Sequence, residues 1–254
     1  MKVRLDKLLL FRGLAPSLEK ARALIFAGQV LVNGRLADKA GTPFPEDVSI
    51  ELKEKACPYV SRGGIKLAAG LDHFHIDPAG FVCADIGAST GGFTDCLLQR
   101  GAAKVYAVDV GYGQLDWKLR QDKRVVVMER TNARNLKAED IPDPLDLAVI
   151  DASFISLKLL LPPLLVFFRK EARILALIKP QFEVERGMVG RGGVVRDSDL
   201  HDAVVAEISD SAQAMGLKAL GVTASPILGP KGNKEFLIYL ASAQQHAALA
   251  HENG

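Results

Sequence analysis

The chain has 254 residues, of which 48% are hydrophobic and 24% charged, and its net charge is only +2. It can therefore bury a substantial core, arranged as one large domain or as a large domain with a small companion. Its three cysteines lack metal-like or paired spacing, and its longest apolar run, residues 157–168, is too short to span a bilayer. We expect a cytoplasmic protein with no metal, no membrane segment and no signal peptide.

The first 39 residues are the most basic part of the chain, with eight Lys or Arg against three Asp or Glu. Apolar spacing predicts a helix from Leu5 to near Gly13 and a second from Ser17, its N-cap, to Gly28. Short strands follow, with a tight turn at residues 33–34. A basic helical face suggests a polyanionic partner, and a solvated surface without a partner is the alternative. The cations on this face are Arg4, Lys7, Arg12, Lys20 and Arg22.

A change in composition near residue 56 predicts the domain boundary. Mixed charge followed by a proline occupies residues 53–58. We expect a first domain over residues 1–55, a linker over 56–62, a second domain over 63–243 and a polar tail over 244–254. Arg62 and Lys66, four residues apart with glycines between them, could project at the mouth of the second domain's sheet, and a basic helix start is the alternative.

A glycine-rich run after Asp85 is the most informative segment. An apolar strand at residues 81–84 precedes it and a helix follows it, which is how an open α/β sheet builds a ligand crevice. The glycines of this run are spaced differently from the Gly-x-Gly-x-x-Gly pattern, and the run carries extra side chains. Such a loop suits S-adenosylmethionine, a nucleoside with an amino-acid tail. Another nucleotide or a plain tight turn are the alternatives. The residues expected at this ligand are Asp85, Gly87, Ser89, Gly91, Gly92 and Phe93.

Two later strand ends extend this ligand site. Asp109 ends an apolar strand at residues 105–108 and could accept hydrogen bonds from both ribose hydroxyls of the ligand, or cap the turn before Gly111. Asn132 follows a strand at residues 125–128, where chain order places the adenine ring. We therefore expect both side chains to contact the ligand.

Asp151 and Lys179 each follow a further strand, at residues 145–150 and 174–178. Because open α/β sheets bind ligands at the carboxyl ends of their strands, we expect both at one site, with Asp151 also near the methyl donor. The lysine could orient or deprotonate a ribose hydroxyl while the aspartate holds its ammonium group. A snorkelling lysine and a helix-capping aspartate are the alternatives. The pair does not suit methylation of a pyrimidine carbon, which would need a cysteine nucleophile. Methylation of a base amino group is not indicated either, because residues 151–154 stand where such enzymes have Asn-Pro-Pro-Tyr or Asp-Pro-Pro-Tyr.

The rest of the chain alternates helix and strand, as a parallel sheet would. A helix is predicted over residues 198–216, followed by two closing strands at 220–223 and 235–240. Residues 187–193, which include Arg191, form a glycine-rich basic loop that we expect to close over the substrate. An ordinary surface loop is the alternative.

Residues 4–9, 21–25 and 28–34 resemble the S4 RNA-binding domain, which contacts structured RNA through phosphates and shape. The resemblance implies that the cations of the two predicted helices bind RNA, namely Arg4, Lys7, Arg12, Lys20 and Arg22. The chain as a whole resembles the TlyA family, described both as haemolysins and as rRNA 2′-O-methyltransferases. Its second domain is similar to FtsJ-type ribose methyltransferases. The matching segments there are the Asp85 loop and residues 59–67, 151–156, 177–183 and 225–235.

The resemblance implies a fold and a catalytic tetrad. The fold is an α/β, Rossmann-like S-adenosylmethionine-dependent methyltransferase sheet with a small N-terminal α+β RNA-binding domain. FtsJ-type enzymes use a Lys-Asp-Lys-Glu tetrad, whose counterparts here are Lys66, Asp151, Lys179 and Glu235. A cytidine ribose is the implied substrate, with ribosomal RNA or ribosomal subunits as partner. We expect Arg62 and Arg191 to contact this RNA as well. A membrane-active toxin and a non-catalytic RNA-binding or assembly factor are the alternative functions.

Overall fold

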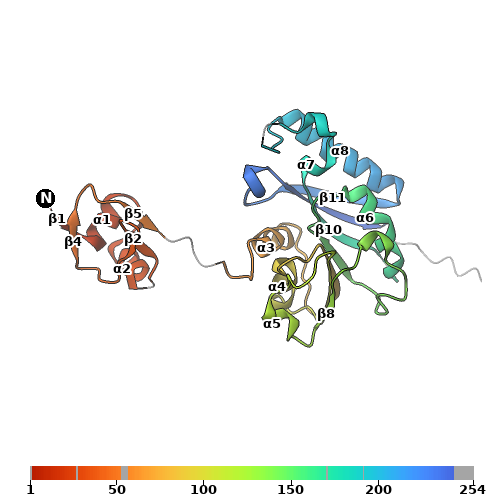
Figure 1. The fold of residues 1–254 in the computed structure, drawn as a ribbon, viewed down its shortest axis with the longest axis horizontal. Coiled ribbons are helices and arrows are strands. Elements are labelled where there is room, and N and C mark those ends of the chain that lie inside the picture. The colour runs from red at the N-terminus through yellow and green to blue at the C-terminus, as the bar shows by residue number, and fades with distance from the viewer. Residues whose placement is uncertain (1, 27, 53–56, 170, 191, 243–254) are drawn as a thin grey trace, which may run out of the picture. The chain divides into compact units, whose positions relative to one another are not determined.

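The computed structural model describes residues 2–26, 28–52, 57–169, 171–190 and 192–242. The chain divides into two compact units, residues 1–57 and 58–254 (Figure 1). The predicted polar tail, residues 244–254, and Arg191 lie outside the described residues, as does most of the charged run before Pro58. Among the described residues, no helix combines the length and the apolar content needed to cross a membrane.

The first unit is a small α+β fold, as expected. Its elements are β1 (Lys2–Arg4), α1 (Leu5–Phe11), α2 (Leu18–Phe26), β2 (Val30–Val32), β3 (Arg35–Leu36), β4 (Pro43–Pro45) and β5 (Ile50–Leu52). Strands β3, β2 and β5 form one sheet and β1 pairs with β4. Both residues of the predicted turn, Asn33 and Gly34, have positive φ, as a type I′ turn between β2 and β3 requires. The core of this unit includes Leu5, Leu9, Ala21, Ile25 and Val30, all completely buried.

The second unit is a seven-stranded sheet with helices on both faces. Its strands are β6 (Val82–Ile86), β7 (Lys104–Val108), β8 (Val125–Met128), β9 (Leu147–Ile150), β10 (Arg173–Ile178), β11 (Leu217–Ala224) and β12 (Phe236–Ser242). Its helices are α3 (Gly63–His73), α4 (Gly92–Gln99), α5 (Trp117–Arg120), α6 (Leu157–Leu164), α7 (Pro180–Glu183) and α8 (Ser198–Ala214). Short 3₁₀ turns add Ala133–Asn135, Leu165–Phe167, Arg186–Met188 and Pro230–Gly232.

Buried side chains on each face of this sheet explain the layering. Leu67, Leu71 and Leu97, from α3 and α4, pack with Cys83 and Val105 on one face. Helices α6 and α8 cover the other face through leucines of α6 and residues of α8 that include Val204 and Ile208 (Figure 1). Strand residues alternate between the two clusters because successive side chains point to opposite faces. The three layers confirm the predicted α/β class.

The order of the strands in the sheet determines where a ligand site is expected. The order is β11-β12-β10-β9-β6-β7-β8, and the five strands from β10 to β8 run parallel. From β6 the chain proceeds outward through β7 to β8, and then returns to the other side of β6 for β9 and β10. This reversal is a Rossmann-like switch point, and ligands bind at the carboxyl ends of the strands beside it.

The expectation of a parallel sheet is wrong at β12. This strand lies between β10 and β11 and runs antiparallel to both. The reason is the short connection of residues 225–235, because a chain that turns back directly beside its preceding strand pairs with it in antiparallel fashion. The reversal matters for the site: Phe236, the first residue of β12, pairs with Ile178, the last residue of β10.

Candidate active site

The pairing of the strands brings four residues that are distant in the sequence to one edge of the sheet, namely Lys66, Asp151, Lys179 and Glu235. Ile86 pairs with Ile150 at the carboxyl ends of β6 and β9, so the loops that follow these strands emerge together. Because β12 begins where β10 ends, Glu235 lies beside Lys179 at this same edge. The sheet thus assembles the predicted tetrad positions from three strands, and α3 supplies Lys66.

Lys66 and Glu235 form a buried ion pair. Lys66 Nζ donates to Glu235 Oε2 at 2.6 Å, and only 8% and 1% of these residues are exposed. Gly229 covers the carboxylate so closely that a Cβ there would lie 2.0 Å from Oε1, which requires glycine at this position. Both charges are desolvated, so each depends on the other.

Lys179 and Asp151 form a second ion pair at the mouth of the site. Lys179 Nζ lies 2.5 Å from Asp151 Oδ1 and donates to Ser153 Oγ at 3.0 Å. Lys179 is 7% exposed, while the Asp151 side chain is 21% exposed. The amine is therefore fixed by two neighbours, and what remains accessible of it faces the cavity that it lines.

These two ion pairs border a cavity of about 620 Å³. Lys66, Asp151 and Lys179 line it directly, and Gly229 separates it from Glu235. Arg62 also lines this cavity, where its guanidinium lies 3.4 Å from the carbonyl oxygen of Leu228. The site therefore offers two fixed ammonium groups and one guanidinium to a negatively charged or polarised substrate.

A second cavity, of about 370 Å³, meets the first at the end of β6. The two cavities share Gly87, Ser89, Asp151 and Ser153 in their walls. Gly87 has φ of 84°, and a Cβ there would lie 2.8 Å from the Asp151 carbonyl oxygen, so the loop can approach the β9 end only through glycine. The remaining lining of this cavity includes apolar residues, which suit a nucleoside.

Asp109 and Asn132 both line the second cavity. The Asp109 carboxylate accepts hydrogen bonds from the backbone amides of Ser89, at 2.8 Å, and Gly111, at 2.6 Å. The turn-capping contact considered from the sequence is thus present, and it holds the carboxylate at the cavity wall. The Asn132 side chain accepts a hydrogen bond from the Arg134 amide at 3.1 Å, which fixes it there too.

The other predicted ligand residues separate into two groups. Ser89, Gly92 and Phe93 line the first cavity, whereas Asp85 and Gly91 line neither of the two. Asp85 is completely buried and accepts hydrogen bonds from the Thr94 amide, at 2.9 Å, and Thr94 Oγ1, at 2.6 Å. It therefore fixes the first turn of α4 behind the glycine loop.

Burial raises the pKa of Asp85 to about 7 from its usual 3.8. The folded state therefore binds a proton more tightly than the unfolded state. The contribution of the protonated Asp85 carboxyl group to folding stability is complete below about pH 4 and is lost as the pH rises through about 7. We expect Asp85→Asn to flatten this part of the stability profile. Thermal unfolding of the wild type and of Asp85→Asn, each at about pH 5 and about pH 8, measures this effect. If the unfolding temperature of the variant differs between the two pH values as much as that of the wild type, the raised pKa of Asp85 would be contradicted.

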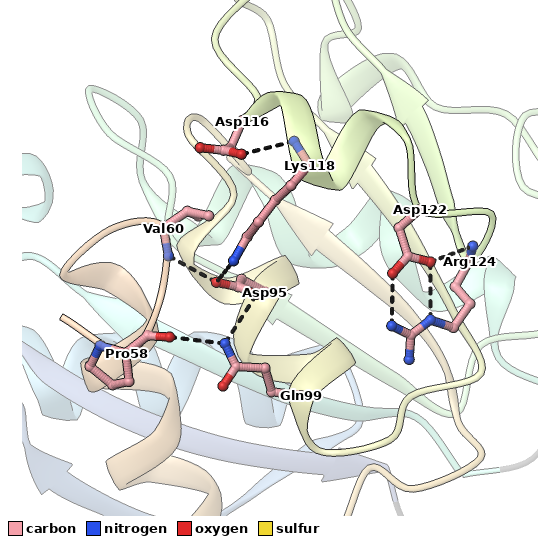
Figure 2. Close-up of polar contacts among 8 residues, drawn as sticks. All are labelled: Pro58, Val60, Asp95, Gln99, Asp116, Lys118, Asp122 and Arg124. Carbon is pink, nitrogen blue, oxygen red and sulfur yellow. Dashed lines mark hydrogen bonds and ion pairs between the residues drawn. The ribbon is translucent and has the colours of Figure 1, made fainter. Parts of the chain in front are cut away.

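Asp95 is a residue that sequence reasoning missed, and it fixes the segment before α3 (Figure 2). Its Oδ2 accepts hydrogen bonds from the Val60 amide, at 2.8 Å, and from Lys118 Nζ, at 3.1 Å. Gln99 Nε2 bridges Asp95 Oδ1 to the Pro58 carbonyl oxygen. Residues 58–60 are thereby held on α4 and α5, although the sequence places them in a linker. In the sequence, an aspartate in a helix's first turn indicates only a favourable dipole interaction.

Glu183 is the second missed residue, and it connects the two loops that carry Asp151 and Lys179. Its carboxylate accepts hydrogen bonds from Ser156 Oγ, at 2.5 Å, and from the Leu157 amide, at 2.9 Å. Burial raises the pKa of Glu183 above its usual value. The contact lies at the far end of both loops, so it braces the spacing of the Lys179–Asp151 pair.

We expect Glu183→Ala to lower kcat by about 10- to 100-fold, because loosening this brace displaces the reacting groups. Glu183→Gln should retain most activity, since its amide oxygen can still accept from the Leu157 amide and its NH₂ can reach Ser156. Steady-state kinetics of both variants tests the point. Equal losses in the two variants would mean that the carboxylate has another role.

The cations predicted in the first unit have different surroundings. Arg4 and Arg22 both contact the carboxylate of Asp6. Arg12 donates to the carbonyl oxygens of Val48, at 2.6 Å, and of Glu46, so it ties α1 to the loop before β5. Lys7 and Lys20 are exposed.

Family models match both units. A model described as FtsJ-like methyltransferase matches residues 59–242, and the S4 domain model matches residues 3–48. The 16S/23S rRNA (cytidine-2′-O)-methyltransferase TlyA of Mycobacterium tuberculosis is 48% identical over 98% of this chain and 93% of its own. Hemolysin A of Brachyspira hyodysenteriae is 41% identical over 93% of this chain and 99% of its own. A solved structure from Streptococcus thermophilus, also named a hemolysin, is 43% identical with a TM-score of 0.74, and covers 95% of this chain and 89% of its own.

Proposed function

The chain belongs to the TlyA family of FtsJ-like methyltransferases, and from this premise we propose that it transfers a methyl group from S-adenosylmethionine to a ribose 2′-hydroxyl of ribosomal RNA. The observation that carries the proposal is the position of Lys66, Asp151, Lys179 and Glu235 around one cavity that opens into a second. The name of the Mycobacterium tuberculosis relative supports a cytidine as the target.

The residues of the second cavity fit the methyl donor. Asp109 presents a carboxylate that can accept hydrogen bonds from the two ribose hydroxyls, and Asn132 lies where the adenine would be flanked. Gly87 and Ser89 belong to both cavities, so the amino-acid end of the donor can extend toward the first. The bound donor supplies an electrophilic methyl group on a sulfonium.

The tetrad residues have distinct roles in this proposal. Lys179 positions or deprotonates the 2′-hydroxyl, beside Asp151, where the cavities meet. Lys66 stabilises the developing negative charge on that oxygen. Asp151 and Glu235 hold the two ammonium groups in place. Most of the rate enhancement comes from positioning, since the oxygen must approach the methyl group in line.

The first unit supports an RNA substrate. Its match to the S4 domain covers residues 3–48, and the first 39 residues of the chain carry eight Lys or Arg against three Asp or Glu. The alternative of a membrane-active protein rests on the hemolysin names of relatives. A non-catalytic RNA-binding protein would not need two buried, paired lysines beside a nucleoside-sized cavity.

Methyl transfer can be tested with isotopically labelled S-adenosylmethionine and separated ribosomal subunits from cells that lack this protein. We expect label in the RNA of at least one subunit, and none in subunits that already carry the modification. Donor binding without any label in either subunit would contradict a ribosomal RNA substrate.

A further inference from the structure

Two arginines of the first unit share one buried carboxylate. Asp6, in the first turn of α1, is completely buried. Arg4 donates to both of its oxygens, from Nε to Oδ1 at 3.1 Å and from Nη2 to Oδ2 at 2.8 Å. Arg22, from α2, donates from Nε to Oδ2 at 3.0 Å. The Lys7 amide also donates to Oδ1, at 3.0 Å, so the carboxylate is fully engaged.

The backbone beneath this cluster is fixed as well. The Leu5 amide donates to the Thr42 carbonyl oxygen at 2.9 Å, and the Asp6 amide donates to the Ala40 carbonyl oxygen at 3.1 Å. The start of α1 is therefore held against the loop before β4. With both the backbone and the carboxylate fixed, the two guanidinium groups have little rotational freedom left.

Both guanidinium groups nevertheless remain at the surface. The Arg4 and Arg22 side chains are 49% and 48% exposed. Among the described contacts with Asp6, Arg22 uses only Nε, and Arg4 uses Nε and Nη2. Their other terminal nitrogens can donate to an acceptor from outside. Two cations on one carboxylate leave one positive charge in excess.

We propose that Asp6 is a positioning residue that presents Arg4 and Arg22 together as one binding site for a backbone phosphate of the RNA substrate. This inference rests on the proposed action on RNA. Planar guanidinium groups match the geometry of phosphate oxygens, and groups that are already ordered lose less entropy on binding. Arg4 holds the pKa of Asp6 at about 2, so the carboxylate stays charged across the physiological pH range.

A purely structural role for Asp6 predicts the opposite effect on RNA binding. If Asp6 only ties α1 to α2 and offsets one of the two positive charges, removing its charge makes the unit more basic and strengthens RNA binding. If it positions the guanidinium groups, the same change weakens binding although the net charge rises. The sign of the change therefore separates the two roles.

The test titrates a fluorescein-labelled RNA hairpin with the full chain and follows fluorescence anisotropy. Asp6→Asn should bind about tenfold more weakly, the loss expected from freeing two ordered side chains. Glu19→Gln is the matched control, because it removes the same charge from the exposed first turn of α2. It should bind as well as the wild type or slightly more tightly. Binding by Asp6→Asn that equals or exceeds that of the wild type would overturn the proposal.

If thermal unfolding shows that Asp6→Asn destabilises the first unit, a second pair of variants tests the phosphate site instead. Arg22→Gln and Arg35→Gln each remove one guanidinium group from the first unit, and Arg35, in β3, is exposed. The proposed site predicts a loss of about tenfold for Arg22→Gln and about twofold or less for Arg35→Gln. Equal losses would overturn it. Failure of the wild type to bind the hairpin would instead overturn the RNA substrate, and the phosphate site with it.

Discussion

Alanine in place of Lys179 is expected to abolish methyl transfer, by about 10²- to 10³-fold or more, while S-adenosylmethionine still binds. The amine is held 2.5 Å from Asp151 and 3.0 Å from Ser153, at the junction of the two cavities. No other described cation pairs with Asp151 in an ion pair. In the proposed mechanism, removing the amine leaves the 2′-hydroxyl without the group that orients or deprotonates it.

Donor affinity and single-turnover transfer should be measured on the same preparation. Lys179 lines the first cavity and not the second, so donor affinity should change less than about threefold. Lys158→Ala is the matched control, because Lys158 pairs with Glu207 on α8 and lines neither cavity. Full activity of Lys179→Ala would remove Lys179 from the mechanism, and equal loss in the control would indicate general damage.

Glu235→Leu is expected to destabilise the second unit by about 3–5 kcal/mol as well as to stop catalysis. Lys66 and Glu235 are almost completely buried, and their contact of 2.6 Å is what offsets the cost of desolvating both charges. Removing the carboxylate leaves the ammonium group buried without its partner. The double variant Lys66→Met/Glu235→Leu should recover most of the stability, because it removes both charges.

Guanidinium unfolding followed by far-UV circular dichroism measures the stability, and methyl transfer measures the function. We expect the double variant to be stable and inactive, which separates folding from chemistry. Wild-type stability in Glu235→Leu would mean that the ion pair contributes nothing to folding. Substantial activity in the double variant would remove both residues from the catalytic group.

Local sequence patterns predicted the parallel strands that form the site. Asp85, Asp109, Asp151 and Lys179 each stand at the end of an apolar run, and the carboxyl ends of parallel strands must share one edge. The alternation of helix and strand predicted that β12 would be parallel, but its short connection to β11 makes it antiparallel. Glu235 could therefore be placed near Lys179 only by resemblance, not by the pattern itself.

Contacts between side chains distant in sequence could not be predicted. Glu183 reaches Ser156, and Asp95 reaches the Val60 amide, only after the loops have folded against each other. Asp85 illustrates the converse: its position after a strand suggested a ligand contact, but its side chain turns inward to Thr94. Strand ends locate a site, whereas the direction of each side chain depends on tertiary packing.

The position of the transferred methyl group tests the central claim most directly. Ribosomal RNA labelled by the purified protein would be hydrolysed with alkali, which cannot cleave the backbone after a 2′-O-methylated ribose. The account predicts that the label remains in an alkali-resistant dinucleotide, and that Lys179→Ala produces none. Label recovered in a single nucleotide with a methylated base would contradict the proposed chemistry.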